Sequence, residues 1–120
     1  MTEKIDYIEF PSRDRAATSS FFAQAFGWGR VGYGPDYDGL EGAGIDGGVD
    51  QATGRVATTM AIVRTDDLDD AERRVIAAGG VITRAPFDFP GGRRFHFREP
   101  GGNELAVWIS REPTQSTSAG

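Results

Sequence analysis

The feature that most constrains the fold of this chain is an internal repeat. Asp14 and Asp67 are each suited to cap the N-terminus of a helix, and Gly27 and Gly80 are each suited to end one. The two Asp residues lie 53 positions apart, and so do the two glycines. A repeat of this length predicts two copies of one strand–helix module within a single domain.

Each copy reads as a strand followed by a helix. Alternation of apolar and polar residues predicts a strand over Tyr7–Phe10 in the first copy, and an apolar run predicts one over Met60–Val63 in the second. Apolar residues at helical spacing then predict the face that each helix buries. These faces are Thr18, Phe21, Phe22 and Ala25 in the first helix, and Leu68, Ala71, Val75 and Ala78 in the second.

Both helices are followed by segments that favour β-hairpins, so the chain is expected to form an α+β fold of two tandem βαβββ modules. We expect one domain over residues 1–112, with modules at about 4–50 and 56–110. The candidate hairpin segments are Tyr33–Tyr37, Gly39–Gly44 and Gly47–Val49 in the first module, and Val81–Thr83, Arg93–Arg98 and Glu104–Ile109 in the second.

Two segments are expected to lie outside the regular structure. The stretch Asp46–Arg55 is rich in glycine and polar residues, which indicates an exposed linker between the modules. Residues 113–120 contain almost nothing apolar to bury, so they are predicted to be a disordered tail.

Composition excludes several classes of function. The chain has 120 residues and a formal charge of -5, which argues against nucleic acid and anionic membranes as partners. It has no Cys, so thiol catalysis, disulfides and Cys-bound zinc are excluded. No basic leader and no apolar run of membrane-spanning length is present, so we expect a soluble, cytoplasmic protein.

Two motifs resemble the vicinal-oxygen-chelate family, which includes glyoxalases, bleomycin-resistance proteins and extradiol dioxygenases. Phe21–Trp28 is similar to its aromatic-rich first helix, and Arg98–Leu105 is similar to its Asp-Pro-x-Gly-Asn hairpin, with Glu99 in place of Asp. With the repeat, the resemblance covers about residues 4–110. It implies one glyoxalase-like domain in which curled mixed sheets surround a cavity.

The resemblance also implies positions for metal ligands, and these positions lack suitable donors. They fall on Tyr7, Met60 and Ala106, and a fourth lies near Glu41 in the segment Leu40–Gly44. A phenol, a thioether and a methyl group do not make a site for a borderline or hard divalent ion. The whole chain has one His. We therefore expect neither a metal nor any other cofactor. A displaced site built from Glu9, His96 and Glu104 remains the alternative.

A small-molecule site is expected in the cavity. Period-two alternation places Glu9 on the face of Tyr7, and the resemblance implies that Arg94 and His96 point inward with Phe95 and Phe97 toward the helices. Arginine suits a carboxylate or phosphate, so an anionic ligand with an aromatic or apolar part is expected. The expected ligand-binding residues are Tyr7, Glu9, Trp28, Met60, Ile62, Arg94, His96, Ala106 and Trp108.

Each of these residues also has a purely structural interpretation. Glu9 can pair with Arg94 only to satisfy two buried charges, and His96 can be a hydrogen-bonded core residue. Met60 and Trp108 can be core residues. The segment Phe89–Arg94 is expected to form a mobile turn beside the pocket, with Arg93 in solvent.

Two functions remain open at this point. The first is a metal-independent small-molecule binder of the glyoxalase and bleomycin-resistance type. The alternative is an enzyme of isomerase, lyase or dioxygenase type, which would use His96 and Glu9 as acid and base or would hold a metal at displaced ligands. The resemblance also implies a homodimer.

Overall fold

The computed structural model of the chain describes residues 3–52 and 58–111, and it contains the predicted βαβββ pattern twice. Within these described residues, two helices and eight strands make up an α+β fold, as expected. In chain order they are β1 (Lys4–Pro11), α1 (Arg15–Phe26), β2 (Gly29–Gly32), β3 (Tyr37–Glu41), β4 (Asp46–Asp50), β5 (Met60–Arg64), α2 (Leu68–Ala77), β6 (Val81–Phe89), β7 (Gly92–Arg98) and β8 (Glu104–Ser110).

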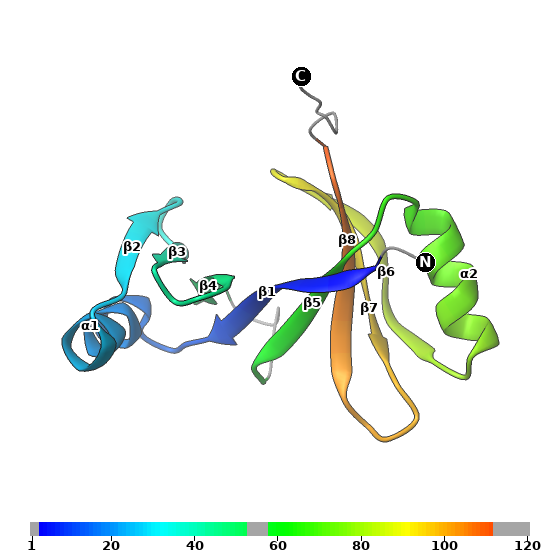
Figure 1. Ribbon diagram of the computed structural model, residues 1–120, viewed down its shortest axis with the longest axis horizontal. Coiled ribbons are helices and arrows are strands. Elements are labelled where there is room, and N and C mark those ends of the chain that lie inside the picture. The colour runs from blue at the N-terminus through cyan, green and yellow to red at the C-terminus, as the bar shows by residue number, and fades with distance from the viewer. Residues whose placement is uncertain (1–2, 53–57, 112–120) are drawn as a thin grey trace. The chain divides into compact units, whose positions relative to one another are not determined.

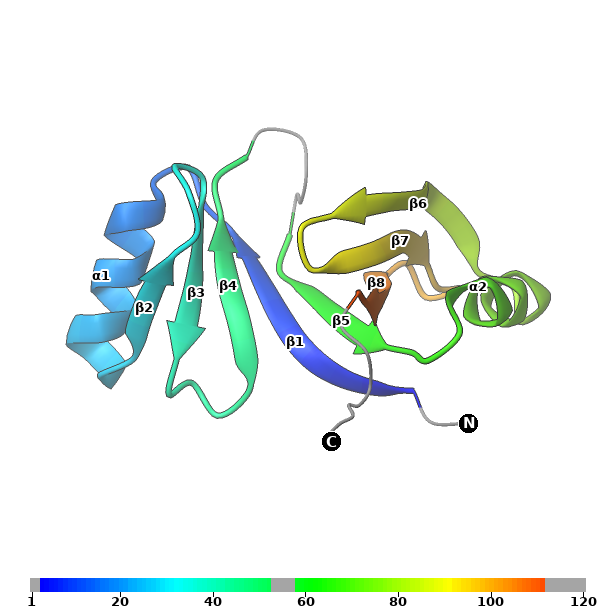
Figure 2. The same cartoon turned by 90° about the horizontal axis from the view of Figure 1, so that it is seen from above.

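The chain divides into two compact units, each described here by itself. The N-terminal unit spans Asp6–Ala61, and the C-terminal unit combines the first residues of β1 with the chain from Ile62 onward. Within the first, the strands are ordered β2-β3-β4-β1, and within the second β5-β8-β7-β6. Both sets are mixed, because β1 pairs with β4 and β5 pairs with β8 in parallel while the other pairs are antiparallel. One helix lies beside each set (Figure 1 and Figure 2).

The starts of both helices and the end of α1 follow the predicted caps, whereas α2 ends at Ala77 with Ala78 as its C-cap and not at Gly80. Asp14 accepts a hydrogen bond from the backbone N–H of Ala17, and Asp67 accepts one from that of Asp70. Gly27 ends α1 in the left-handed conformation, with φ of 77°, and donates its N–H to the carbonyl of Ala23. These contacts satisfy backbone groups that the helix ends would otherwise leave without partners.

The predicted apolar face of α1 is wrong in half of its members. Phe21 is 60% exposed and Ala25 is also exposed, whereas Ser19 is buried. The reason lies in the strand beneath the helix, where Asp38 of β3 is fully buried. Its carboxylate accepts hydrogen bonds from Ser19 and Arg15, so polar residues of α1 turn toward the sheet.

The predicted face of α2 is confirmed where the helix is regular. Leu68 and Ala71 are buried against Phe95 of β7 and Val107 of β8. Half-buried Val63, Val75, Ile82, Phe97 and Ile109 pack around this cluster. Ala78, the last predicted member, follows the helix as its C-cap and is exposed.

The predicted linker Asp46–Arg55 is wrong over its first half. Asp46–Asp50 forms β4 between β1 and β3, and residues 47–50 are buried. Glycine serves close packing there, since a Cβ on Gly47 would lie 2.8 Å from the carbonyl oxygen of Ile8. The remainder of that segment from residue 53, and the predicted tail at 113–120, lie outside the described residues.

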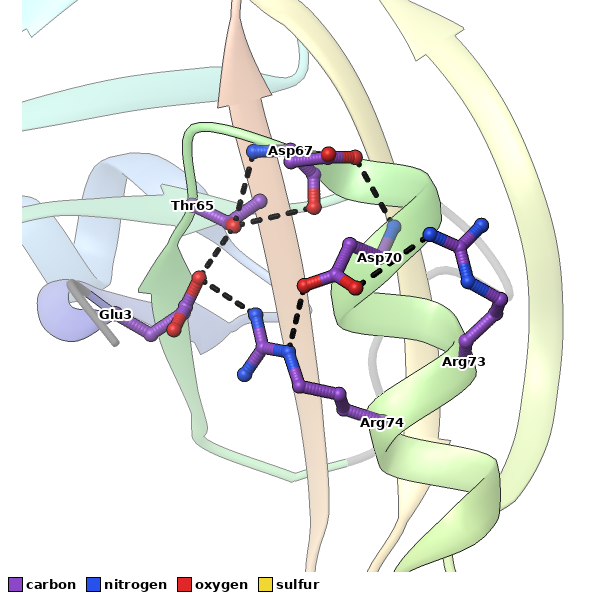
Figure 3. A network of polar contacts seen from close by, with 6 residues as sticks. All are labelled: Glu3, Thr65, Asp67, Asp70, Arg73 and Arg74. Carbon is purple, nitrogen blue, oxygen red and sulfur yellow. Dashed lines mark hydrogen bonds and ion pairs between the residues drawn. The ribbon is translucent and has the colours of Figure 1, made fainter.

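A polar network ties the start of the chain to α2 (Figure 3). Glu3 accepts hydrogen bonds from the Thr65 hydroxyl at 2.7 Å and from Arg74 at 2.9 Å. Arg74 also donates to Asp70 at 2.8 Å, one helical turn earlier. The hydrogen bond from Arg74 and that from Thr65 lower the pKa of Glu3 from 4.5 to about 2, against the opposing effect of desolvation.

This network predicts a pH-dependent stability contribution from Glu3. Because the folded-state pKa is depressed, the contribution is present above the unfolded value of 4.5 and is lost as pH falls toward about 2. Urea unfolding of the wild type and of Glu3→Gln should therefore differ at neutral pH and converge below pH of about 2. In an Arg74→Met background, most of this pH-dependent difference should disappear; an unchanged difference would contradict the assignment.

Candidate functional site

The C-terminal unit places four of the predicted site residues on the face of its sheet that α2 does not cover. Arg94 pairs with Trp108, and His96 pairs with Ala106, in the antiparallel register of β7 and β8. Directly paired residues point to the same face, so these four side chains share it. Phe95 points the other way, into the core under α2. Arg94 and His96 therefore lie opposite Phe95, as predicted, while their pointing into a ligand cavity stays a prediction.

Four residues from four strands form a continuous row across this face. Arg64 of β5 pairs with Trp108 of β8, which pairs with Arg94 of β7, which pairs with Phe87 of β6. The guanidinium carbon of Arg64 lies 5.1 Å from the Trp108 ring centre, and that of Arg94 lies 5.9 Å from the rings of Phe87 and Phe89. Cations and aromatic rings thus alternate, and we call these four residues the cation–aromatic row.

A β-bulge in β6 adds Arg84 to the same face. Strand alternation alone would put Arg84 and Phe87 on opposite faces. The register shifts between them, so Arg84 pairs with His96 while Phe87 pairs with Arg94. The Arg84 guanidinium consequently lies over the Phe87 ring, 3.7 Å from its centre. The bulge contains Pro86, which has no N–H to contribute to a regular ladder.

Arg94 and His96 form a buried pair within this face. Arg94 is 5% exposed and donates from Nε to Nε2 of His96 at 3.0 Å. Because Nε2 accepts this bond, the neutral imidazole carries its proton on Nδ1. The edge-on ring of Phe87 lies 5.6 Å from the imidazole. Any acid–base role of His96 through Nε2 would require breaking the bond to Arg94, and that role stays a prediction.

Two guanidinium groups on this face have no acidic partner in the described part of the chain. Arg64 is half-buried and Arg84 is exposed, and neither forms an ion pair with a carboxylate there. By contrast, ion pairs with carboxylates are formed by Arg15, Arg30, Arg73, Arg74 and Arg93. In a chain with a net charge of -5, this face therefore offers local positive charge beside aromatic rings.

The segment Phe89–Arg94 is only partly the turn that was predicted. Phe89 ends β6 and Gly92 begins β7, so the arginines lie in a strand. Arg93 is exposed and pairs with Asp88, which agrees with its expected place in solvent, while Arg94 is buried. A Cβ on Gly92 would lie 2.0 Å from the carbonyl oxygen of Ile109, so the close approach of β7 and β8 requires glycine there.

The N-terminal unit joins Tyr7, Glu9 and Tyr37 on the face that α1 does not cover. The two phenol oxygens of Tyr7 and Tyr37 are 2.5 Å apart, and Tyr37 donates to Oε2 of Glu9 at 2.9 Å. Glu9 is 1% exposed. Burial raises the pKa of Tyr37, and the neighbouring Glu9 and Tyr7 raise it further, so Tyr37 stays a neutral phenol.

A glycine makes room for this arrangement. Gly48 of β4 lies beside Glu9 in the parallel register, and a Cβ on it would meet the Tyr37 hydroxyl oxygen at 2.2 Å. Any side chain at this position would displace the phenol from Glu9. The same glycine-rich composition that suggested a linker thus creates space for a polar site.

The remaining predicted pocket residues fall into two groups. Met60, Ile62 and Ala106 are buried, with exposures of 1%, 3% and 0%. Trp28 instead packs on the aromatic residues of α1, with its ring centre 4.9 Å from that of Phe22. The structure therefore places Trp28 in the α1 aromatic cluster. The predicted contacts of Glu9 with Arg94 and His96 join the two units and stay predictions.

The residues at the expected metal positions do not fit a metal ion. Tyr7 is hydrogen-bonded to Tyr37, Met60 offers only a thioether and Ala106 offers no donor. Within the alternative set, Glu104 accepts a hydrogen bond from Thr83 at 2.6 Å. Across residues 3–52 and 58–111, no three or more His, Cys, Asp or Glu side chains are grouped in a way that can hold a metal.

Sequence reasoning missed four residues of these two faces. Tyr37 lies in the candidate hairpin segment Tyr33–Tyr37, and its place on β3 depends on long-range pairing with β4. Arg64 lies one position beyond the predicted end of β5. Arg84 and Phe87 depend on the bulge, for which Pro86 inside an otherwise strand-like run was the available signal.

Comparisons with known proteins agree with this architecture. The sequence profile of the Glyoxalase/Bleomycin resistance protein/Dioxygenase superfamily matches residues 4–107. No curated protein matches the chain. Among the helices of the described segments, none is long and apolar enough to cross a membrane. The predicted homodimer and cytoplasmic location stay predictions.

Several solved structures share the fold at low sequence identity. A glyoxalase/bleomycin resistance protein/dioxygenase superfamily member from Vibrio splendidus 12B01 is 17% identical, with a TM-score of 0.69 over 91% of this chain and 100% of its own. A variant of the Streptomyces coelicolor methylmalonyl-CoA epimerase, in complex with 2-nitronate-propionyl-CoA, is 14% identical, with a TM-score of 0.69 over 90% and 97%. The Mn(II)-bound glyoxalase from Novosphingobium aromaticivorans is 22% identical, with a TM-score of 0.65 over 88% and 38%.

Proposed function

The chain belongs to the Glyoxalase/Bleomycin resistance protein/Dioxygenase superfamily, and from this premise we propose that it binds a small organic anion with an aromatic part, without using a metal ion. The observation that carries the proposal is the cation–aromatic row of the C-terminal unit. Within it, Arg64, Trp108 and Phe87 are half-buried and therefore reachable, while Arg94 is buried.

The charges of this face favour an anion as the ligand. Arg64 and Arg84 hold guanidinium groups against aromatic rings, and neither is neutralised by a carboxylate of the described residues. A guanidinium donates two parallel hydrogen bonds to a carboxylate or phosphate, and a low-dielectric aromatic surrounding strengthens them. An anionic group of the ligand would supply the missing negative charge.

The aromatic rings favour a planar body attached to that anion. Trp108 lies 6.1 Å from Phe89 between ring centres, and Phe87 continues the aromatic surface beyond Arg94. Ring stacking provides affinity together with orientation, and small-molecule sites typically combine such apolar walls with a few polar groups.

The donor set supports the proposal of metal independence. A member of the fold family that chelates its ligand needs oxygen or nitrogen donors from several side chains. Here those positions hold Tyr7, Met60 and Ala106, and the buried polar groups are instead arranged as the Arg94–His96 pair and the Tyr7–Tyr37–Glu9 chain. In this proposal, arginine guanidinium groups balance the negative charge of the ligand.

The proposal is tested with a matched pair of probes, naphthalene-2-carboxylate and its neutral amide. The carboxylate should bind and quench tryptophan fluorescence, and the amide should bind more weakly. Substitution Arg64→Gln should weaken carboxylate binding by about tenfold, because one charged hydrogen-bond donor is lost. Its effect on amide binding should be small.

Arg13→Gln is the matched control, because Arg13 is exposed in the loop before α1. It removes the same charge from the protein and should leave both affinities unchanged. Equal binding of carboxylate and amide, or equal effects of the two substitutions, would contradict an anion site on the row.

A further inference from the structure

We propose that the cation–aromatic row and Arg84 together bind an aromatic dianion, a ligand that carries one anionic group at each end of a planar body. This inference rests on the proposed function and narrows its ligand class. The observation that carries it is the position of two guanidinium groups, those of Arg64 and Arg84, at opposite ends of one aromatic surface.

The two cations lie over rings of different strands. In the order β5-β8-β7-β6, Arg64 extends from β5 over Trp108 of β8, and Arg84 lies over Phe87 of β6. Their guanidinium carbons are 5.1 and 3.7 Å from these two ring centres. Since β8 and β6 are two strand spacings apart, the two charges are separated by about 10 Å. One small anionic group can therefore reach one of these cations and not both.

Aromatic rings lie between the two cations. The ring centre of Phe89 is 6.1 Å from that of Trp108, and the Arg94 guanidinium carbon is 5.9 Å from the rings of Phe87 and Phe89. Gly92, which pairs with Phe89 on β7, has no side chain to separate Phe89 from Trp108. The three rings are half-buried, so a planar ligand can stack on them between one cation and the other.

The two guanidinium groups keep donors for a ligand. Arg84 stacks its face on the Phe87 ring, and the N–H groups of a guanidinium lie in its plane, so they project past the ring. Among the described residues, no carboxylate is within ion-pair distance of Arg64 or Arg84. Even Glu104, which accepts a hydrogen bond from the adjacent Thr83, is not an ion-pair partner of Arg84. Each cation therefore suits one carboxylate of a ligand.

The β-bulge in β6 supports a role for the second cation. In a regular strand, Arg84 would face away from Phe87. The shift of register between these two residues turns Arg84 to the face that Arg64 also occupies. A bulge interrupts the backbone ladder, and bulges near binding sites commonly redirect a side chain. Here the irregular backbone delivers a second positive charge to the ligand face.

Three planar probes test the spacing of the two charges. Naphthalene-2,6-dicarboxylate carries its carboxylates at opposite ends, naphthalene-2,3-dicarboxylate carries the same charge at one end, and naphthalene-2-carboxylate carries a single carboxylate. Calorimetric titration of the wild type should show that the 2,6-isomer binds about tenfold more tightly than either of the others, because only this isomer makes a second charged contact.

Arg84→Gln tests which residue makes the second contact. This substitution should lower the affinity for the 2,6-isomer by about tenfold, so that its advantage over naphthalene-2-carboxylate disappears. Arg73→Gln is the matched control, because Arg73 is exposed on α2, which covers the other face of the sheet. It removes the same charge and should keep the advantage of the 2,6-isomer at about tenfold.

Two results would overturn this inference while the proposed function stands. One is equal binding of the two isomers alongside binding of naphthalene-2-carboxylate, and the other is an unchanged advantage of the 2,6-isomer in Arg84→Gln. Thermal unfolding checks that the variant folds, and the comparison of probes on the wild type needs no variant. If none of the three probes binds, the proposed function and this inference are both wrong.

Discussion

Asp38→Ala is expected to destabilise the protein by about 3–5 kcal/mol, the largest loss of stability that we expect from one polar side chain. The Asp38 carboxylate is fully buried and accepts hydrogen bonds from Arg15 at 2.6 Å and from Ser19 at 2.7 Å. Burial raises the pKa of Asp38, but the bonds from Ser19 and Arg15 outweigh this effect and hold it below its usual value. Alanine would leave Arg15 with an uncompensated charge.

Urea unfolding measures this loss, and Asp36→Ala is its matched control. Asp36 lies two positions earlier and is exposed, so its substitution should change the free energy of unfolding by less than about 0.5 kcal/mol. A similar result for both variants would show that α1 is held to β3 by other contacts. In that case the account of why Phe21 turns outward would be wrong.

Arg94→Leu is expected to weaken binding of naphthalene-2-carboxylate by about 100-fold, the largest effect of one residue on the proposed function. Arg94 is the buried centre of the cation–aromatic row, where it orients His96 and lies near two aromatic rings. Arg94→Lys keeps the charge but loses the planar group, so an intermediate loss of about tenfold is expected. Calorimetric titration gives both affinities.

Arg93→Leu is the matched control for Arg94→Leu. Arg93 is adjacent in sequence but exposed, and it pairs with Asp88. Its substitution removes an equal charge and should leave affinity nearly unchanged. If Arg93→Leu weakens binding as much as Arg94→Leu, general attraction between charges would explain the affinity, and the row would not be the site.

The sequence predicted the fold well because its signals there are local. Helix capping by Asp14 and Asp67 involves residues three positions away, and the repeat of these signals is enough to indicate two equal modules. The facing of Arg94 and His96 away from Phe95 was implied by the family resemblance, and regular alternation in β7 produces it. Each of these features is present within a short stretch of sequence.

The parts that could not be predicted depend on contacts between distant segments. Ser19 is buried because Asp38, on another element, binds it, so helical spacing alone gave the wrong face for Phe21. Tyr37 meets Glu9 only because β4 lies between their strands. Glycines of β4 looked like a linker because composition does not distinguish flexibility from close packing.

The most direct test of the central claim is calorimetric titration of naphthalene-2-carboxylate into protein dialysed against EDTA, repeated after addition of Mn(II), Zn(II) or Ni(II). We predict the same affinity for the carboxylate with and without each metal, because arginine side chains and not a metal ion bind its negative charge. The neutral amide should bind more weakly in every case. Binding that appears only after a metal is added would contradict the claim and would require a ligand set in this chain that includes Glu9 and His96.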